Sequence, residues 1–309
     1  MIRNANIATN AAISPTKIAG GIDNYFIPNN VRRVAQPESW TGGNYYRKIV
    51  DSMPSGMVYN EVHLACADAD EADVIYVHAG DAVYLSDAVS TITAPRVKLF
   101  GQQAHPGLWG SPSFHSHATD VILLNVLGNQ CEIAGLGFHV QAANKGIQLG
   151  ETSVVWRTYI HDCFFGGNAT GTYGVDAGCT YDAPYTVIAN CKFEDFATAN
   201  IRLNAHHSMV IGTIHVVYTA KIGVEYVPNG GDRPYGQILD NRFSTSDATN
   251  AYGIKVTNTP TAGLVFIDGN RFSYFHGDDH AISKVTSGYL GCNWLDDGTG
   301  ADGSPIQIA

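Results

Sequence analysis

The stretches VIANCKF (187–193), ILDNRF (238–243) and FIDGNRF (266–272) repeat one phrase along the chain. In each stretch an aliphatic residue is followed three positions later by Cys or Asn, and Phe follows two positions after that. Repetition at a period of about 20–50 residues is typical of solenoid proteins, in which each repeat is one structural unit. The fold prediction therefore starts from this phrase.

The phrase extends to seven positions, separated by 23 to 29 residues. Its aliphatic anchors are Ile133, Ile160, Ile188, Ile211, Ile238, Ile267 and Leu290. Five residues after each anchor stand Phe138, Phe165, Phe193, Val216, Phe243, Phe272 and Leu295. A second phrase follows the first six anchors, as GIQL (146), GVDA (174), NIRL (200), GVEY (223), GIKV (253) and AISK (281).

Both phrases alternate apolar and polar residues, which is the period of a β-strand. Gly, Asn, Asp and Thr separate them and supply turns. We therefore predict an all-β fold, a right-handed single-stranded parallel β-helix in which like residues stack on successive coils and bury a continuous core. Cys163 and Cys191 share the third position of the phrase and are expected to be buried thiols. Asn at this position is expected inside a bend, with its amide bonded to the next coil.

The repeat divides the chain into four segments. Strand-like stretches at 73–85, 96–101 and 120–126 extend the coils upstream, so about eight or nine coils fit into a β-helix over 73–297. Residues 45–72 contain short helical patterns and are expected to cap the open N-terminal end, because an exposed sheet edge invites aggregation. Residues 1–44 are expected to form an extended arm and residues 298–309 a tail.

Composition excludes several classes of partner. Lys and Arg number 18 against 28 Asp and Glu, a formal net charge of −10. No basic field exists to attract nucleic acid or an anionic membrane surface. No segment has the 18 or more apolar residues of a membrane span. The six cysteines contain no CxxC pair, so no zinc site and no cofactor are expected.

One row of side chains offers candidate chemistry. The outward position of the second phrase carries Asp176, Arg202 and Glu225 on three successive coils. The two carboxylates would be about 9.6 Å apart, near the separation in inverting glycosidases, and Arg202 is similar to the arginine base of a pectate lyase. The alternative is an ion-pair ladder, because the charges alternate in sign and opposite charges on neighbouring strands stabilise the register. We expect the ladder and no active site.

The irregular segment 102–119 is expected to protrude from the coils. Its His115 and His117 would lie on one face of an extended segment and form a possible metal pair. Its Trp109 and Phe114 are candidates for a contact with a neighbouring subunit, because aromatic anchors dominate interface energies. The alternative for Trp109 is packing on its own coil.

The coils at 73–297, entered by DVIYVHAGD, resemble the pectate-lyase-like β-helix superfamily, which includes polysaccharide lyases, glycosidases, phage tailspikes and non-enzymatic virion proteins. The first residues, NANIATNAAISPTKIAGG, are similar to the N-terminal arms of tailed-phage virion proteins. The resemblance implies a homotrimer in the virion, assembled in the host cytoplasm.

Ile7, Ile13 and Ile18 are spaced as isolated anchors among small polar residues. We expect them to order on a partner such as the major capsid protein or another virion protein. The function that we favour is a structural virion protein, a capsid decoration or spike protein. Two alternatives stay open, a polysaccharide-degrading tailspike (lyase or glycosidase) and a non-catalytic adhesin that binds a host-surface glycan.

Overall fold

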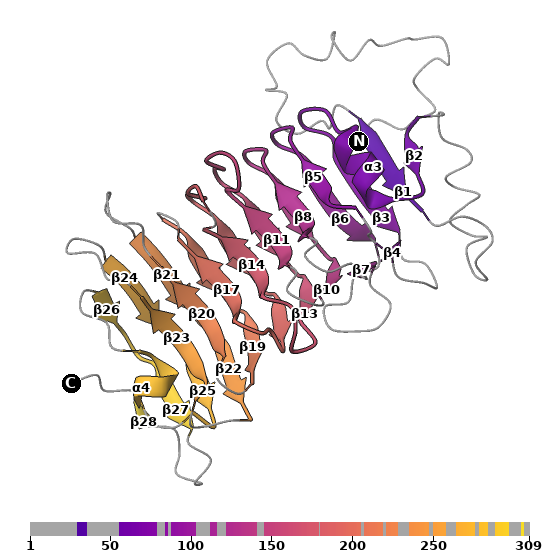
Figure 1. Cartoon of the computed structure of the whole chain (residues 1–309). Coiled ribbons are helices and arrows are strands. Elements are labelled where there is room, and N and C mark those ends of the chain that lie inside the picture. The colour runs from indigo at the N-terminus through magenta and orange to yellow at the C-terminus, as the bar shows by residue number, and fades with distance from the viewer. Residues whose placement is uncertain are drawn as a thin grey trace, which may run out of the picture.

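The computed structural model describes residues 30–35, 56–78, 84–85, 88–102, 112–115, 122–140, 145–178, 180–204, 207–218, 221–227, 235–246, 250–257, 264–275, 278–283, 288–296 and 304–305. These residues form an elongated stack of short strands, with the N-terminal strands at one end and the C-terminal strands at the other (Figure 1). Neither of the helices among them, α3 (Val62–Ala67) and α4 (Asp278–Ala281), is long and apolar enough to cross a membrane.

The described strands form three sheets. In hydrogen-bonded order, sheet A contains β2 (Val58–Tyr59), β1 (Val31–Val34), β3 (Val74–His78), β6 (Lys98–Gln102), β9 (Glu132–Ala134), β12 (Tyr159–His161), β15 (Val187–Ala189), β18 (Met209–Ile211), β21 (Tyr235–Leu239), β24 (Leu264–Asp268) and β26 (Gly288–Leu290). Sheet B contains β4 (Tyr84–Leu85), β7 (Ser113–His115), β10 (Gly137–His139), β13 (Phe164–Gly166), β16 (Lys192–Glu194), β19 (Ile214–Val217), β22 (Arg242–Thr245), β25 (Arg271–Ser273), β27 (Trp294–Asp296) and β28 (Ser304–Pro305). Sheet C contains β5 (Ser90–Ile92), β8 (Ile122–Val126), β11 (Lys145–Leu149), β14 (Tyr173–Ala177), β17 (Ala199–Leu203), β20 (Ile222–Tyr226) and β23 (Tyr252–Val256).

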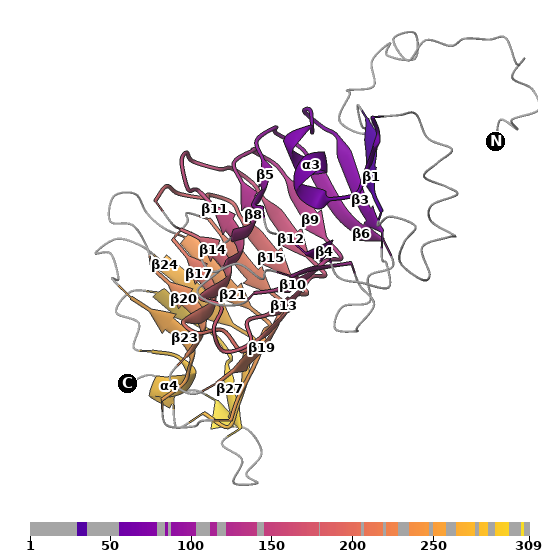
Figure 2. The same cartoon turned by 45° about the vertical axis from the view of Figure 1, so that its right-hand side comes forward.

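The central coils each contribute one strand to each sheet, as β9, β10 and β11 do in one coil and β12, β13 and β14 in the next. All the pairings are parallel except that of β27 with β28. Figure 2, turned from the first view, shows the same stacking from another side. The predicted parallel β-helix is therefore confirmed.

The core is a set of ladders in which like side chains stack. Ile133, Ile160 and Ile188 are register partners in sheet A and are fully buried. In sheet B the rings of Phe138, Phe165 and Phe193 are nearly parallel, with centroids 4.9 Å and 4.6 Å apart. This spacing is the separation of neighbouring strands, about 4.8 Å, so the aromatic stacking follows directly from the register.

The same ladder corrects the prediction for Phe114. Its ring is fully buried and stacks on Phe138 at 5.0 Å, because β7 pairs with β10 in sheet B. Phe114 is therefore a core residue, and its prediction as an exposed subunit contact was wrong. The segment 102–119 contains a strand of the coils where a wholly protruding loop was expected. Trp109 and His117 lie outside the described residues, as does the side chain of His115.

One coil differs from the predicted register by one residue. Ile188 and Ile238 both pair with Val210, so the anchor in this coil is Val210 and not Ile211. Five residues after Val210 comes His215, which occupies the Phe position in place of the predicted Val216. Its ring stacks on Phe193 at 5.2 Å and on Phe243 at 4.6 Å. An imidazole is flat like a phenyl ring, so the stack continues through it.

The partners of His215 keep its ring neutral. Thr213 Oγ1 donates to Asn241 Oδ1 at 2.7 Å, so this hydroxyl accepts the hydrogen of His215 Nε2, 2.6 Å away. The other ring nitrogen, Nδ1, faces the donor Nδ2 of Asn200 at 3.3 Å and accepts from it. A proton added to Nδ1 would oppose this donor, and burial lowers the pKa of His215 to about 3.

The third position of the phrase behaves as predicted. Asn241 and Asn270 are fully buried, and each backbone N–H donates to the side-chain oxygen of the next Asn, at 3.0 Å and 3.1 Å. The amide of Asn241 also donates to Val210 O on the preceding coil. Cys163 and Cys191 are buried free thiols, as expected.

The N-terminal end of the stack begins earlier than predicted. Strand β1 falls inside the segment predicted as an arm, yet it pairs with β3 along four residues. Arg32 takes the inward position of this strand and bonds the buried Asp73 at 2.7 Å. Helix α3 buries Val62, Ala65 and Cys66 in the core. The role of α3 as a cap stays a prediction, and Ile7, Ile13 and Ile18 lie outside the described residues.

The neutral His215 predicts an acid-sensitive fold. An unfolded histidine takes up a proton near its ordinary pKa of about 6.5, whereas the folded chain does not until about pH 3. The contribution of the neutral His215 to the free energy of unfolding is therefore fully present above about pH 6.5. Below this pH it falls by about 1.4 kcal/mol per pH unit. We expect His215→Phe to remove this part of the pH dependence in urea unfolding between pH 7 and 5. Equal slopes for the two proteins would contradict a buried neutral His215.

Candidate functional site

The predicted charge row lies on the outer face of sheet C. Asp176, Arg202 and Glu225 are register partners on β14, β17 and β20. Arg202 Nε and Nη2 donate to the two carboxylate oxygens of Asp176 at 2.8 Å and 2.9 Å. Lys145 Nζ lies 2.7 Å from the same carboxylate. The sequence had assigned no role to Lys145.

This geometry leaves the Asp176 carboxylate without access to a substrate. The side chain is fully buried, and both oxygens are held by cationic groups. A catalytic acid must come within hydrogen-bond reach of the glycosidic oxygen. The ion pair between Asp176 and Arg202 matches the ladder expected from the sequence, and it fixes the pairing of β14 with β17.

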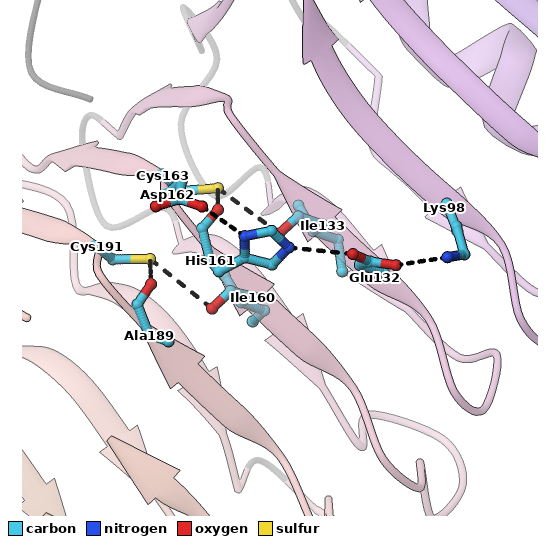
Figure 3. A network of polar contacts seen from close by, with 9 residues as sticks. All are labelled: Lys98, Glu132, Ile133, Ile160, His161, Asp162, Cys163, Ala189 and Cys191. Carbon is cyan, nitrogen blue, oxygen red and sulfur yellow. Dashed lines mark hydrogen bonds and ion pairs between the residues drawn. The ribbon is translucent and has the colours of Figure 1, made fainter. Parts of the chain in front are cut away.

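A second group of polar side chains lies on the outer face of sheet A (Figure 3). Lys98 Nζ contacts Glu132 at 2.9 Å, and His161 lies between Glu132, 3.2 Å from Nε2, and Asp162, 2.7 Å from Nδ1. Burial alone would raise the pKa of Glu132, but its bonds to Lys98 and His161 outweigh burial and lower it. These four residues therefore form a network of polar contacts across three coils.

The described residues hold no group of three or more His, Cys, Asp or Glu side chains that fits a metal ion. Glu132 and Asp162 are instead joined through His161, whose two ring nitrogens each contact one of the carboxylates. Beside it, the ring of Tyr159 stacks on His161 at 4.2 Å and is 39% exposed. An exposed ring next to hydrogen-bonding groups is a combination that ligand sites often use.

A longer row of rings begins on the same coil. Trp156, Tyr185, His207 and Tyr235 lie on four successive coils, just before or at the start of the sheet A strands. Their ring centroids follow one another at 6.0, 4.9 and 5.1 Å. Trp156 is 46% and Tyr185 41% exposed, and His207 is exposed as well. We call these four residues the aromatic ladder.

Two residues of the aromatic ladder have an unusual backbone conformation. Tyr185 and His207 have positive φ values of 60° and 55°, as does Arg157 at 60°, the residue after Trp156. A bulky residue in this region costs about 1–3 kcal/mol, and Arg96 and Gln130 have the same positive φ at the equivalent positions of earlier coils. The bend is common to the coils, because Arg157 N bonds Pro184 O at 2.9 Å in the next one.

Neighbouring groups orient the first rings. The backbone N–H of Trp156 donates to Asn129 Oδ1 at 2.8 Å. The Arg157 guanidinium lies 5.8 Å from the centroid of the Tyr185 ring, within cation–π range. The aromatic ladder is therefore a fixed row of flat apolar surfaces with a positive group beside it.

Sequence reasoning did not find the aromatic ladder. Its members lie in bends, where composition varies between coils, and one of them is a histidine. Their spacing nevertheless carried a signal, since the intervals 185 − 156 = 29, 207 − 185 = 22 and 235 − 207 = 28 follow the period of the buried phrase. A search for exposed rings at the core period would have identified them.

Comparisons with known proteins establish the fold. No family model and no curated protein matches the sequence. Among solved structures, the chain is similar to a pectin methylesterase mutant in complex with a hexasaccharide, with a TM-score of 0.55 and 10% identity over 91% of this chain and 93% of that one. Pectate lyase Pel9A gives a TM-score of 0.45 with 11% identity, covering 89% and 82%. The ORF18 protein of Geobacillus virus E2 gives 0.37 with 15% identity, covering 76% and 57%. The first likeness supports the parallel β-helix fold.

The buried ion pair predicts a structural role for Asp176. In Asp176→Asn, Arg202 and Lys145 would face each other without a negative charge, so we expect a loss of about 3–5 kcal/mol in the free energy of unfolding. Glu225→Gln on the same row is the control and should cost less than about 1 kcal/mol. Urea unfolding followed by circular dichroism measures both. A variant at Asp176 as stable as the control would refute this role.

Proposed function

We propose that this chain is a surface protein of a tailed-phage virion that binds a bacterial glycan without cleaving it. The aromatic ladder carries the proposal. One face of a pyranose ring is lined by C–H groups and packs on flat aromatic surfaces, while its hydroxyls bond polar neighbours. Several rings at the repeat of the coils suit a polymer with a repeated unit better than a single small molecule.

The rigid setting of the rings favours such binding. The backbone at the aromatic ladder is held by hydrogen bonds between coils, so the rings lose little conformational entropy when a glycan binds. His161 and Glu132, on the same outer face as Tyr159, supply donors and acceptors for hydroxyl groups. Of the alternatives left open by the sequence, the non-catalytic glycan-binding protein therefore agrees best with the surface.

The absence of cleavage is part of the proposal. It is supported by the state of Asp176, the acid that a glycosidase mechanism on sheet C would require. Its carboxylate is buried and held by Arg202 and Lys145. A group in this state does not reach a glycosidic bond, so the row on sheet C serves the register of the strands.

The virion location rests on the N-terminal sequence. We propose that Ile7, Ile13 and Ile18 attach the chain to the major capsid protein or another virion protein, and that the coils form a homotrimer. Because β1 belongs to the β-helix, the attached segment must end before Val31. The position on the particle that we favour is that of a capsid decoration or spike protein.

Substitutions in the aromatic ladder test glycan binding. On an array of bacterial capsular, lipopolysaccharide and cell-wall glycans, the full chain should bind a glycan and release no reducing ends or unsaturated products. Trp156→Ala and Tyr185→Ala should each weaken binding at least fivefold, about 1 kcal/mol. Tyr289→Ala removes a 56% exposed ring elsewhere on sheet A and is the matched control. The proposal fails if no glycan binds or if the ladder variants bind like the control.

Removal of residues 1–29 tests the attachment. This truncation keeps β1, so the shortened chain should stay folded and trimeric by light scattering. It should fail to decorate particles that lack the protein, whereas the full chain should bind them. Attachment of the shortened chain as tight as that of the full chain would exclude the docking role of the N-terminal segment.

A further inference from the structure

The last coils carry a cleft on the outer face of sheet B. It has a volume of about 480 Å³ and is lined by Arg271, Phe272, Ser273, Trp294 and Asp296. β25 and β27 supply these residues in register, with Arg271 beside Trp294 and Ser273 beside Asp296. Side chains alternate along a strand, so these four point outward while Phe272 points into the core and forms the floor.

The cleft combines an aromatic ring with charged and hydroxyl side chains. Trp294 is 45% exposed and offers a flat apolar face beside a guanidinium. Two residues further along each strand, Ser273 supplies a hydroxyl and Asp296 a carboxylate. A planar ring with donors and acceptors around it is the usual composition of a small-molecule site.

A second arginine stands next to the cleft. Arg242 on β22 is the register partner of Arg271, so the two exposed cations occupy neighbouring strands about 4.8 Å apart. Like charges directly opposite each other destabilise a sheet. Among the residues that the structure describes, neither arginine takes part in an ion pair.

This pair departs from the pattern in the rest of the molecule. The other register pairs of two charged residues in the described strands, such as Lys98 with Glu132 and Asp176 with Arg202, have opposite signs. The chain also has an excess of ten acidic residues, so carboxylate partners are plentiful in the sequence. An anion between Arg242 and Arg271 would remove their repulsion, and a guanidinium pair bonds carboxylate or phosphate oxygens well.

We propose that this cleft binds a sugar residue that carries a negatively charged substituent. The anionic group lies between Arg242 and Arg271, and the C–H face of the sugar packs on Trp294. Ser273 and Asp296 bond the hydroxyl groups at the other end of the ring. Asp296 repels the anionic substituent, so the sugar is held in one orientation.

The site is separate from the aromatic ladder. The ladder lies along sheet A from the coil of Trp156 to that of Tyr235, whereas the cleft lies on sheet B in the coils of Arg271 and Trp294. The proposal that the ligand of the cleft is a sugar rests on the proposed glycan binding. The arrangement of the residues in the cleft does not depend on that proposal. Polymer binding by the ladder and monosaccharide binding by the cleft can therefore fail independently.

Titration calorimetry of the full chain with three matched sugars tests the proposal. Glucose, glucuronate and glucose 6-phosphate differ only at the sixth carbon, and inorganic phosphate is a further probe. We expect glucuronate or glucose 6-phosphate to bind and glucose to bind at least tenfold more weakly. The stronger of the two anionic sugars identifies the substituent. Arg271→Gln should weaken this binding at least tenfold and Trp294→Ala at least threefold.

Lys192→Gln is the matched control, because it removes one positive charge from the same column of sheet B, two coils before Arg242. It should bind like the unaltered chain. The proposal is overturned if none of the sugars binds, if glucose binds as tightly as its anionic forms, or if Arg271→Gln behaves like Lys192→Gln. Binding of inorganic phosphate as tight as that of glucose 6-phosphate, unaffected by Trp294→Ala, would equally overturn the sugar site.

Discussion

The stacking of each inward side chain on its counterpart in the next coil is the interaction on which this molecule depends. A single coil cannot bury its own inner face, so its apolar side chains are covered only when the next coil lies in register. Phe165 touches Phe138 on one side and Phe193 on the other, with centroids less than 5 Å apart. A shift of one residue would turn every one of these rings outward. The register is therefore set by the core.

The same register determines what the surface can do. Every outward position is repeated at the strand spacing, so a side chain type that recurs on successive coils becomes a row. The aromatic ladder is such a row, and the polar contacts from Lys98 through Glu132 to His161 also cross successive coils (Figure 3). The core therefore sets a spacing of about 4.8 Å between equivalent surface residues of neighbouring coils, and the proposed glycan would bind along rings placed at this spacing.

The sequence predicted the repeated part of this structure well. The Ile and Phe columns, the Asn bend and the row of Asp176 and Arg202 could be located, because stacking demands similar residues at similar spacing. His215 could not be placed, because a buried imidazole is ordinarily costly and only Thr213 and Asn200 make it acceptable. Phe114 was misassigned because an irregular loop sequence surrounds its short strand. The cleft beside Arg271 depends on a neighbouring strand 23 residues away, since 294 − 271 = 23, and sequence patterns alone did not indicate it.

The central claim is that a glycan binds along the aromatic ladder as a continuous platform. The most direct test is the affinity of the full chain for oligosaccharides of increasing length, cut from the glycan that binds best on the array. Four rings at three strand steps span about 14 Å. The affinity is predicted to rise with each added sugar until the oligosaccharide covers this span, and then to level off. A single sugar unit that binds as tightly as the longer oligosaccharides would contradict the account.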